Sequence, residues 1–326
     1  RRLATDHAGL VENLTITTSR SGNAETVHVK TLAGTDPSPT DPVRIALNTT
    51  TGGFEVLELT AALSVTLSSG STLGATDGDP FRVWLVVFND AGTLRLGAIK
   101  CALTDGVYGL QDNVQESSTA EGGSGGADSA GVIYTGTAVT SKMMRVLGYL
   151  EYTLTTAGTW DTAPSLVRLW GRGDKLPGDT VQFRRVDNGA YYSGSTTVPV
   201  DDSIPQNTEG TEFPSTISIT PTSAANMLRS NAVLNLRPGT TSANSIMMSM
   251  FRDSDASAIA VNQQNSSGLW PVHSSISVLM PAKSLASTTL KLRYGGSTEA
   301  VTVNGQSSLE FGGKLNSFIS VEEIMV

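Results

Sequence analysis

The chain closes on a patterned stretch, Leu309–Val326, which reads LEFGGKLNSFISVEEIMV. Apolar and polar residues nearly alternate over residues 318–324, which is the two-residue period of a β-strand with one face in a core. Chain termini usually fray because few contacts hold them. A strand pattern that continues almost to the last residue therefore indicates that this strand has a structural role.

Earlier in the chain, short alternating runs are separated by turn residues. The run LTITTSRSGNAETVHVKTL, residues 14–32, turns at Ser21-Gly22-Asn23, and the run VRIALNTTTGGFEVLEL, residues 43–59, turns at Gly52-Gly53. Glycine and asparagine tolerate the left-handed backbone that tight hairpin turns need. The sequence therefore predicts consecutive β-hairpins over residues 10–60.

The most apolar block is FRVWLVVFNDAGTLRLGAIKCAL, residues 81–103. Its two strong runs, Arg82–Phe88 and Thr93–Leu103, are separated by the compact turn Asn-Asp-Ala-Gly at residues 89–92. Residues 83–88 are continuously apolar rather than alternating, which is typical of a strand buried on both faces. We expect this strand to be central in its sheet.

From Gly178 onward the chain contains about eight short strand-like runs separated by Asn, Gly, Pro and Ser. This regular spacing is typical of a two-sheet sandwich or jelly roll. In one run, alternation sends Met248 and Met250 to one face and Met247 to the other, which favours core packing over a ligand role.

The fold class expected from these patterns is all-β, in two domains. Residues 1–176 are predicted to form an N-terminal β-rich domain of the β-sandwich type, and residues 177–326 a C-terminal jelly roll. The length of 326 residues suits two domains of ordinary size. Residues 116–131, ESSTAEGGSGGADSAG, are predicted to be a flexible Gly-rich surface loop of the first domain.

The charge of the chain excludes some classes of partner. The net charge is −8 at pH 7, and lysine and arginine form no run beyond the pairs Arg1-Arg2 and Arg184-Arg185. A nucleic-acid binder needs a basic surface, so no nucleic-acid partner is predicted. No segment approaches the 18 consecutive apolar residues of a membrane-spanning helix, so no membrane insertion is predicted.

Cysteine and histidine residues form no recognisable catalytic or metal-binding pattern. Cys101, the only cysteine, lies in an apolar run, where a cysteine is usually a small buried side chain. The histidines His7, His28 and His273 are isolated and show no zinc-ligand or triad spacing. We therefore predict no catalytic residue, no cofactor site and no metal site, and a protein that is not an enzyme.

Two acidic pairs are candidates for catalytic or calcium-binding groups. Asp201 and Asp202 are neighbours, so on an extended chain they point to opposite faces and cannot flank one glycosidic bond. Asp253 and Asp255 lie two apart but lack the glycine and glutamate of a calcium-binding loop. The sequence favours turns at both places, and a domain-joining turn at GRGDK, residues 171–175, despite its integrin-type triplet.

Aromatic residues beside loop-like sequence suggest weak recognition sites. Tyr191-Tyr192 and Trp270 are placed where exposed rings would stack on sugars. The neighbours of Trp270 are apolar: Leu269, Pro271 and Val272. A buried anchoring role is therefore the favoured interpretation for this tryptophan.

Several stretches give the chain a family resemblance. The second half resembles the tumour-necrosis-factor-like or C1q-like jelly roll at the end of many tailed-bacteriophage fibre proteins, and the first half resembles modules that precede it in phage virion proteins. The stretches that carry the resemblance are LAGTDPSPTDPV (32–43), TAEGGSGGADSAGVIY (119–134), TTAGTWDTAPSLVRLW (155–170), VPVDDSIPQNTEGTEF (198–213), LRYGGSTEAVTVNGQ (292–306) and FGGKLNSFISVEEI (311–324).

The resemblance implies a homotrimer in which the final strand sits centrally in a sheet and helps to bury the trimer core. Glu322-Glu323 departs from that picture, because one acid must face inward. We expect that acid at the domain end or in a polar layer.

The resemblance also implies a non-enzymatic structural component of a tailed phage particle. The leading hypothesis is a tail fibre or receptor-binding protein on the outside of the virion, attached to the tail, that adheres to a bacterial surface receptor such as a polysaccharide. One alternative is a head fibre or decoration protein on the capsid, and another is a polysaccharide-degrading tailspike. Residues 1–12, RRLATDHAGLVE, are expected to bind the neighbouring virion protein.

Overall fold

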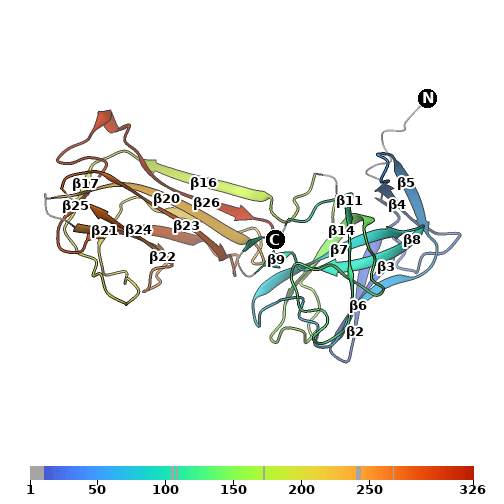
Figure 1. The fold of residues 1–326 in the computed structure, drawn as a ribbon. Helices are drawn as coiled ribbons and strands as arrows, with labels where there is room; N and C mark the ends of the chain where they lie inside the picture. Colours follow the sequence, from blue (N-terminus) through green and yellow to red (C-terminus); the bar gives the residue numbers. More distant parts are fainter. Residues whose placement is uncertain (1–10, 104–105, 108, 172, 240–243, 267) are drawn as a thin grey trace. The chain divides into compact units, whose positions relative to one another are not determined.

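The computed structural model describes residues 11–103, 106–107, 109–171, 173–239, 244–266 and 268–326. It divides the chain into two compact units, which we call unit 1 (Arg1–Asp179 with Met325–Val326) and unit 2 (Thr180–Ile324). Within the described residues, strands dominate, and the helical structure is the short 3₁₀ turn η2 (Phe311–Gly313). The all-β prediction is confirmed (Figure 1). No helix among these residues has the length and apolarity that crossing a membrane requires.

The largest sheet of unit 1 has β7 near its centre. The continuous apolar run forms β7 (Pro80–Asp90), which pairs with β14 (Lys142–Thr153) on one side and β8 (Thr93–Ile99) on the other. Every residue from Phe81 to Phe88 is buried. The prediction of a central strand covered on both faces is confirmed. The remaining strands of this sheet are β11 (Val114–Glu116), β12 (Thr119–Ala120), β13 (Tyr134–Thr135) and β15 (Leu166–Leu169).

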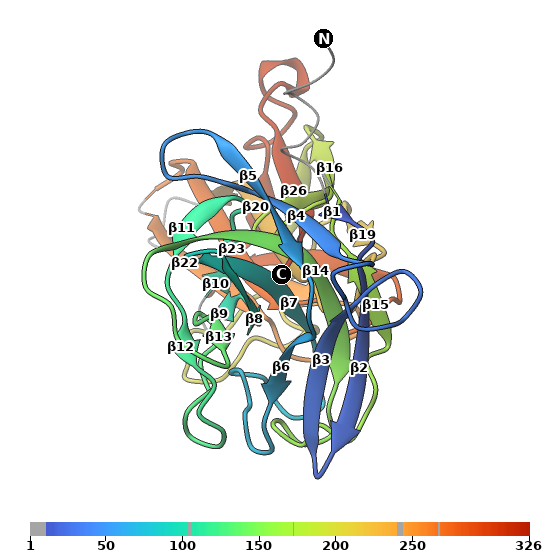
Figure 2. The same ribbon diagram turned by 90° about the vertical axis from the view of Figure 1, so that its right-hand side faces the viewer.

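The two predicted hairpins of residues 10–60 are present, but in separate sheets. The first joins β2 (Thr15–Ser21) to β3 (Ala24–Lys30) and projects from unit 1 as a pair of adjacent strands (Figure 2). Its turn residues Gly22 and Asn23 have φ of 58° and 61°, the left-handed geometry for which their residue types were suited. The partner strands of the three smaller sheets are β6 (Leu63–Leu67) beside β3, β1 (Val11–Glu12) and β5 (Phe54–Leu59) beside β4 (Val43–Asn48), and β9 (Ala102–Leu103) beside β10 (Gly106–Val107).

The Gly-rich stretch 116–131 is bonded to its surroundings more fully than its composition suggested. The Glu121 carboxylate accepts hydrogen bonds from the Ser68 backbone N–H at 2.9 Å and from the Ser71 hydroxyl. Ala127 is fully buried, and its carbonyl accepts a bond from the Leu73 N–H at 2.8 Å. The composition of a segment indicates only how freely it would move in isolation. The bonds that hold this segment come from residues about fifty positions away, so composition does not reveal them.

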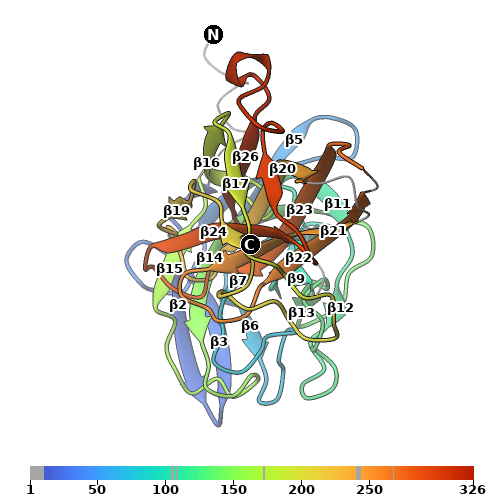
Figure 3. The same ribbon diagram turned by 90° about the vertical axis from the view of Figure 1, so that its left-hand side faces the viewer.

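Unit 2 is a two-sheet sandwich of the jelly-roll type (Figure 3). One sheet, sheet A, contains β16 (Thr180–Asn188), β26 (Ser317–Ile324), β20 (Met227–Pro238), β25 (Val301–Val303), β17 (Tyr192–Gly194) and β23 (Val272–Pro281). The other, sheet B, contains β18 (Thr211–Glu212), β24 (Thr288–Gly296), β21 (Asn244–Arg252), β22 (Ala260–Ser266) and β19 (Ile217–Ile219).

The core of unit 2 lies between these sheets, and the methionines contribute to it as predicted. Met248 and Met250 on β21 are fully buried in the cluster that also contains Leu234 of β20. Met247 points to the other face of sheet B. The estimate of about eight strands was too low, because the described residues of unit 2 contain eleven. Four of them have only two or three residues, which is too short for a periodic pattern to show.

The closing strand β26 is central in sheet A. It pairs with β16 on one side and β20 on the other, so the expected pairing on both sides is confirmed (Figure 1). Beyond it, Met325 and Val326 are buried and belong to unit 1. The Arg82 guanidinium donates to the Val326 carbonyl at 3.0 Å. Residues 317–326 are therefore held by strand pairing and burial.

Candidate functional site

The strand register of unit 2 defines two ends. At one end, Ile324 of β26 pairs with Thr180 and with Met227, so the chain enters and leaves the unit there. At the other end, Asn188 pairs with Ser317. We call this second end the distal end; it carries the described connections 189–191, 268–271 and 304–316.

Two exposed aromatic rings mark the distal end. The exposed fraction is 74% for Trp270 and 76% for Phe311, the highest values among the large apolar residues that the structure describes. Leu309 nearby in sequence is 48% exposed. The prediction that Trp270 is a buried anchor is wrong. Of its apolar neighbours, only Val272, the first residue of β23, packs against the core, whereas Pro271 is exposed and Leu269 is only partly buried.

Hydrogen bonds fix the backbone from which each ring projects. Phe311 opens the turn η2, in which the Gly313 N–H donates to the Glu310 carbonyl at 2.9 Å. The Trp270 carbonyl accepts a hydrogen bond from the Ser266 hydroxyl at 3.2 Å. An aromatic side chain with two side-chain torsions on a fixed backbone loses little entropy when it binds.

A buried polar network supports the connections of the distal end. Asn304, with φ of 59°, donates from its side-chain amide to the carbonyls of Asn188 at 2.7 Å and Ala190 at 3.0 Å. The Ser317 hydroxyl donates to Asn304 Oδ1 at 2.7 Å. Asn304 is fully buried, so these bonds satisfy groups that would otherwise be costly to bury. The network fixes three separate segments against one another.

The two neighbouring tyrosines are packed rather than displayed. The Tyr192 ring lies edge-on to Phe213 at a centroid distance of 5.8 Å. The Tyr191 hydroxyl donates to the Gln306 carbonyl at 3.4 Å, and its ring borders Gly305. Both side chains are half-buried, so they brace the distal end.

The histidines are separated by the fold. His28 lies in unit 1, where its Nε2 is 2.8 Å from the Ser19 hydroxyl, and burial together with Lys30 lowers its pKa. His273 lies in unit 2 with Nδ1 2.6 Å from Asn235 Oδ1. His7 lies outside the described residues. Among those residues, no three histidine, cysteine or acidic side chains gather as a metal site would need.

Cys101 is buried, as its apolar run predicted. Its side chain has no exposed surface, and burial raises the pKa of the thiol. A raised pKa keeps the thiol protonated at neutral pH, and the protonated form is a poor nucleophile. β8 ends at Ile99, four residues before the end of the predicted run at Leu103, and Cys101 has a left-handed backbone with φ of 69°.

The acidic and basic pairs lie in turns or on the surface. The Asp201 carboxylate accepts bonds from the Ser203 N–H at 2.8 Å and the Ser203 hydroxyl at 2.5 Å, which confirms a turn. In GRGDK, the Asp174 N–H donates to the Gly171 carbonyl at 2.9 Å, again a turn, although Arg172 lies outside the described residues. Arg185 is exposed, pairs with Asp187 at 2.8 Å and stacks over the Phe318 ring.

No protein-family profile and no curated protein matches this chain. Among solved structures, it is similar to the protein of T=1 particles derived from infectious bursal virus, with 12% identity, a TM-score of 0.26, and coverage of 100% of this chain and 77% of that one. A protein of the infectious bursal disease virus Gx strain gives 12% identity, a TM-score of 0.25, and coverage of 99% and 80%.

A third similar structure is the insecticidal δ-endotoxin Cry8Ea1 from Bacillus thuringiensis, with 10% identity, a TM-score of 0.24, and coverage of 97% of this chain and 53% of that one. TM-scores of this size do not establish a common fold. Function is therefore argued from the residues of this chain.

Proposed function

We propose that this protein is a non-enzymatic structural component of a tailed phage particle, and that it acts as a tail fibre or receptor-binding protein that adheres to the bacterial surface. The observation that carries the adhesive role is the display of Trp270 and Phe311 on the braced distal end of a jelly roll. The six stretches that resemble phage virion proteins support the assignment of this chain to a phage particle. The receptor is a surface component that aromatic rings recognise, such as a polysaccharide.

Exposing these two rings to water costs free energy. Burying an aromatic ring is favourable, so two large rings held in water on a fixed backbone are available to a partner. Single contacts of this kind are weak. A homotrimer, as the resemblance implies, presents three distal ends at once, and multivalency raises the strength of attachment well above that of one site.

We assign attachment to the particle to the N-terminal end of the chain. Residues 1–12 would bind the neighbouring virion protein, and the distal end would point away from it. Residues 11–12 form β1, which pairs with β4 in the structure; residues 1–10 lie outside the described residues. Deleting residues 1–10 should release the protein from particles while leaving the purified chain folded. Unchanged incorporation would refute this assignment.

The location on the particle can be tested directly. Antibody against residues 180–326 should label the tail of purified particles in electron microscopy. Label spread over the head would overturn the tail assignment and favour the alternative of a capsid fibre or decoration protein.

The adhesive role needs a separate test with the full-length purified protein. It should compete with particles for adsorption to host cells, and the double variant Trp270→Ala/Phe311→Ala should lose most of this competition. Leu285→Ala is the matched control, because Leu285 is 62% exposed but lies in the β23–β24 connection, at the opposite end of unit 2. Equal competition by the double variant and the control would contradict a binding role for the distal rings.

A further inference from the structure

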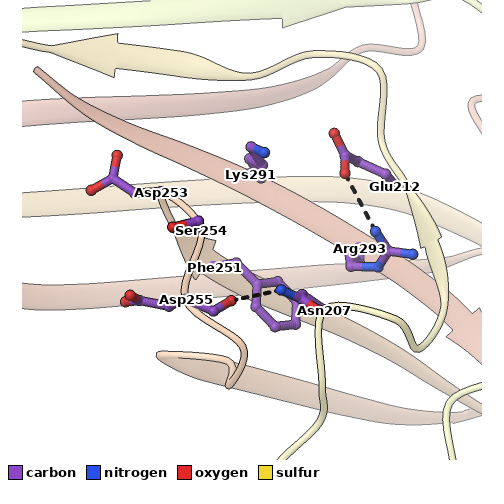
Figure 4. Close-up of a pocket in the computed structure, with 8 residues that line it drawn as sticks. All are labelled: Asn207, Glu212, Phe251, Asp253, Ser254, Asp255, Lys291 and Arg293. Carbon is purple, nitrogen blue, oxygen red and sulfur yellow. Dashed lines mark hydrogen bonds and ion pairs between the residues drawn. The ribbon is translucent and has the colours of Figure 1, made fainter.

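A polar hollow lies on the outer face of sheet B, away from the distal end. Its volume is about 330 Å³, at the lower limit of pockets that hold small molecules. Its lining comes from β24, from β21 with the connection to β22, and from β18 with the chain before it (Figure 4). Its lining residues are Asn207, Glu212, Phe251, Asp253, Ser254, Asp255, Lys291 and Arg293.

Strand alternation on β24 directs two cations into this hollow. Leu290, Leu292 and Tyr294 are buried in the core of unit 2. The intervening residues Lys291 and Arg293 therefore project from the opposite face of sheet B. The sequence TTLKLRYGG shows this alternation, although sequence alone does not show what covers the outer face.

Arg293 is fully engaged by the protein. It donates to the carbonyls of Glu209 at 2.8 Å and Gly210 at 2.7 Å, and its Nη1 lies 3.3 Å from the Glu212 carboxylate (Figure 4). The Lys291 ammonium, in contrast, forms no hydrogen bond or ion pair with any residue that the structure describes. The wall formed by β24 is therefore rigid. Of its two cations, only the Lys291 ammonium has no partner among the described residues, so it is available to a ligand.

The facing wall is the β21–β22 turn. Asp253, with φ of 51°, accepts a hydrogen bond from the Thr289 N–H at 2.6 Å and also lies 3.7 Å from Arg252. Asn207 Nδ2 donates to the Asp255 carbonyl at 3.1 Å, which links the turn to the segment before β18. The Asp255 carboxylate has no ion-pair partner among the described residues. Phe251, almost wholly buried, supplies the apolar part of the lining.

The uncommitted groups constrain the ligand. Lys291 provides hydrogen-bond donors and Asp255 provides acceptors, so the free charges cancel and favour a neutral ligand. The Ser254 hydroxyl can do both, and Asn207 Oδ1 adds an acceptor. A hydroxyl-rich ring matches such a surface, because each hydroxyl both donates and accepts.

We propose that this hollow binds one neutral pyranose unit of a surface glycan, with Lys291 and Asp255 as its principal contacts. This inference rests on the proposed function, since the glycan would belong to the bacterial receptor. The volume is sufficient for one ring, and the rest of the glycan would lie outside. It is a second contact point, on a different face from the aromatic rings of the distal end.

Saturation-transfer difference NMR on the full-length protein tests this proposal with the methyl pyranosides of glucose, galactose and mannose. At least one should give signals. Lys291→Ala or Asp255→Asn should weaken its binding about tenfold or more, as expected for loss of a charged hydrogen bond. Lys175→Ala and Asp202→Asn are charge-matched controls on exposed residues outside the hollow and outside the distal end, and should leave binding unchanged.

Three results would overturn the proposal: no signal from any of the three pyranosides, equal signals from the pocket variants and the controls, or a preference for methyl glucuronide over the neutral sugars. These outcomes are distinguishable from failure of the proposed function. Loss of sugar binding with intact adsorption competition would refute the hollow as a sugar site and leave the adhesive role standing. Sugar binding without adsorption competition would leave the pocket standing and refute the adhesive role.

Discussion

Each unit buries one glutamate completely, and the two carboxylates have opposite surroundings. Glu323 of β26 accepts hydrogen bonds from Thr222 N–H and Oγ1 at 2.8 Å, from Gln182 Nε2 at 2.7 Å and from Asn226 Nδ2 at 2.5 Å. Glu25 of β3 has Arg20 as its nearest cation, 3.9 Å away and partly exposed to water. Both side chains have no exposed surface.

The pKa values of the two groups consequently shift in opposite directions. Burial dominates at Glu25 and raises its pKa, against smaller opposing effects of the nearby Thr18 side chain and Arg20. Burial also acts to raise the pKa of Glu323, but hydrogen bonds from Asn226, Gln182 and Thr222 together outweigh it, and the pKa is lowered. The comparison teaches that the donors around a buried acid, rather than its depth, determine the direction in which its pKa shifts.

The largest expected effect comes from removing the better-satisfied acid. Glu323→Ala leaves the donors of Thr222, Gln182 and Asn226 without an acceptor, so unit 2 should lose more than about 3 kcal/mol of unfolding free energy. Hydrogen exchange followed by mass spectrometry can measure each unit separately. Asp202→Asn, an exposed acid of the same unit, should change stability by less than about 0.5 kcal/mol. A similarly small change for Glu323→Ala would show that the hydrogen bonds to Glu323 contribute little to the stability of unit 2.

The pH dependence of the two units should have opposite signs. The lowered pKa of Glu323 contributes stability to unit 2 above the unfolded value of about 4.5, and this contribution is lost as pH falls through the folded pKa. The raised pKa of Glu25 contributes to unit 1 below about 4.5, and that contribution is lost as pH rises through the folded pKa. Chemical denaturation from pH 3 to 8 measures both. Parallel curves for the two units would contradict the assignment.

A smaller effect is expected from neutralising the poorly satisfied acid. Glu25→Gln keeps the shape of the side chain but removes the charge, so unit 1 should become more stable at pH 7 by about 1 kcal/mol. The dependence of its stability on pH should also flatten. The denaturation midpoint of unit 1 is the measurement, with unit 2 as the internal control. Destabilisation at pH 7 would show that the Arg20 contact outweighs the cost of burial.

The smallest effect on stability is expected at the distal end. Trp270→Ala should change the unfolding free energy of unit 2 by less than about 0.5 kcal/mol, because its ring contributes little to the core. Thermal unfolding measures this change, and the adsorption assay supplies the functional contrast. A loss of several kcal/mol would mean that the ring is a structural anchor after all.

The sequence pattern was most informative where one face of a strand is buried. The alternation in residues 318–324, the continuous run ending at Phe88 and the turn at Gly22-Asn23 all appear as expected. The pattern failed at Trp270. This residue lies in a short loop, where strand alternation does not apply, so its apolar neighbours do not indicate whether its side chain is buried. It also missed the hollow between Asn207 and Lys291, whose walls come from segments far apart in the chain.

The sequence by itself determined that this protein is all-β, where its longer strands run, and that one acid of Glu322-Glu323 must face inward, because strand periodicity is a property of neighbouring residues. Only the tertiary structure decided that Glu323 is the inward acid and that Thr222 and Asn226 satisfy it. Those partners lie about a hundred positions away. Folding brings such residues together through the register of whole sheets, so the exposure of Trp270 and the lining of the hollow follow from packing rather than from local pattern.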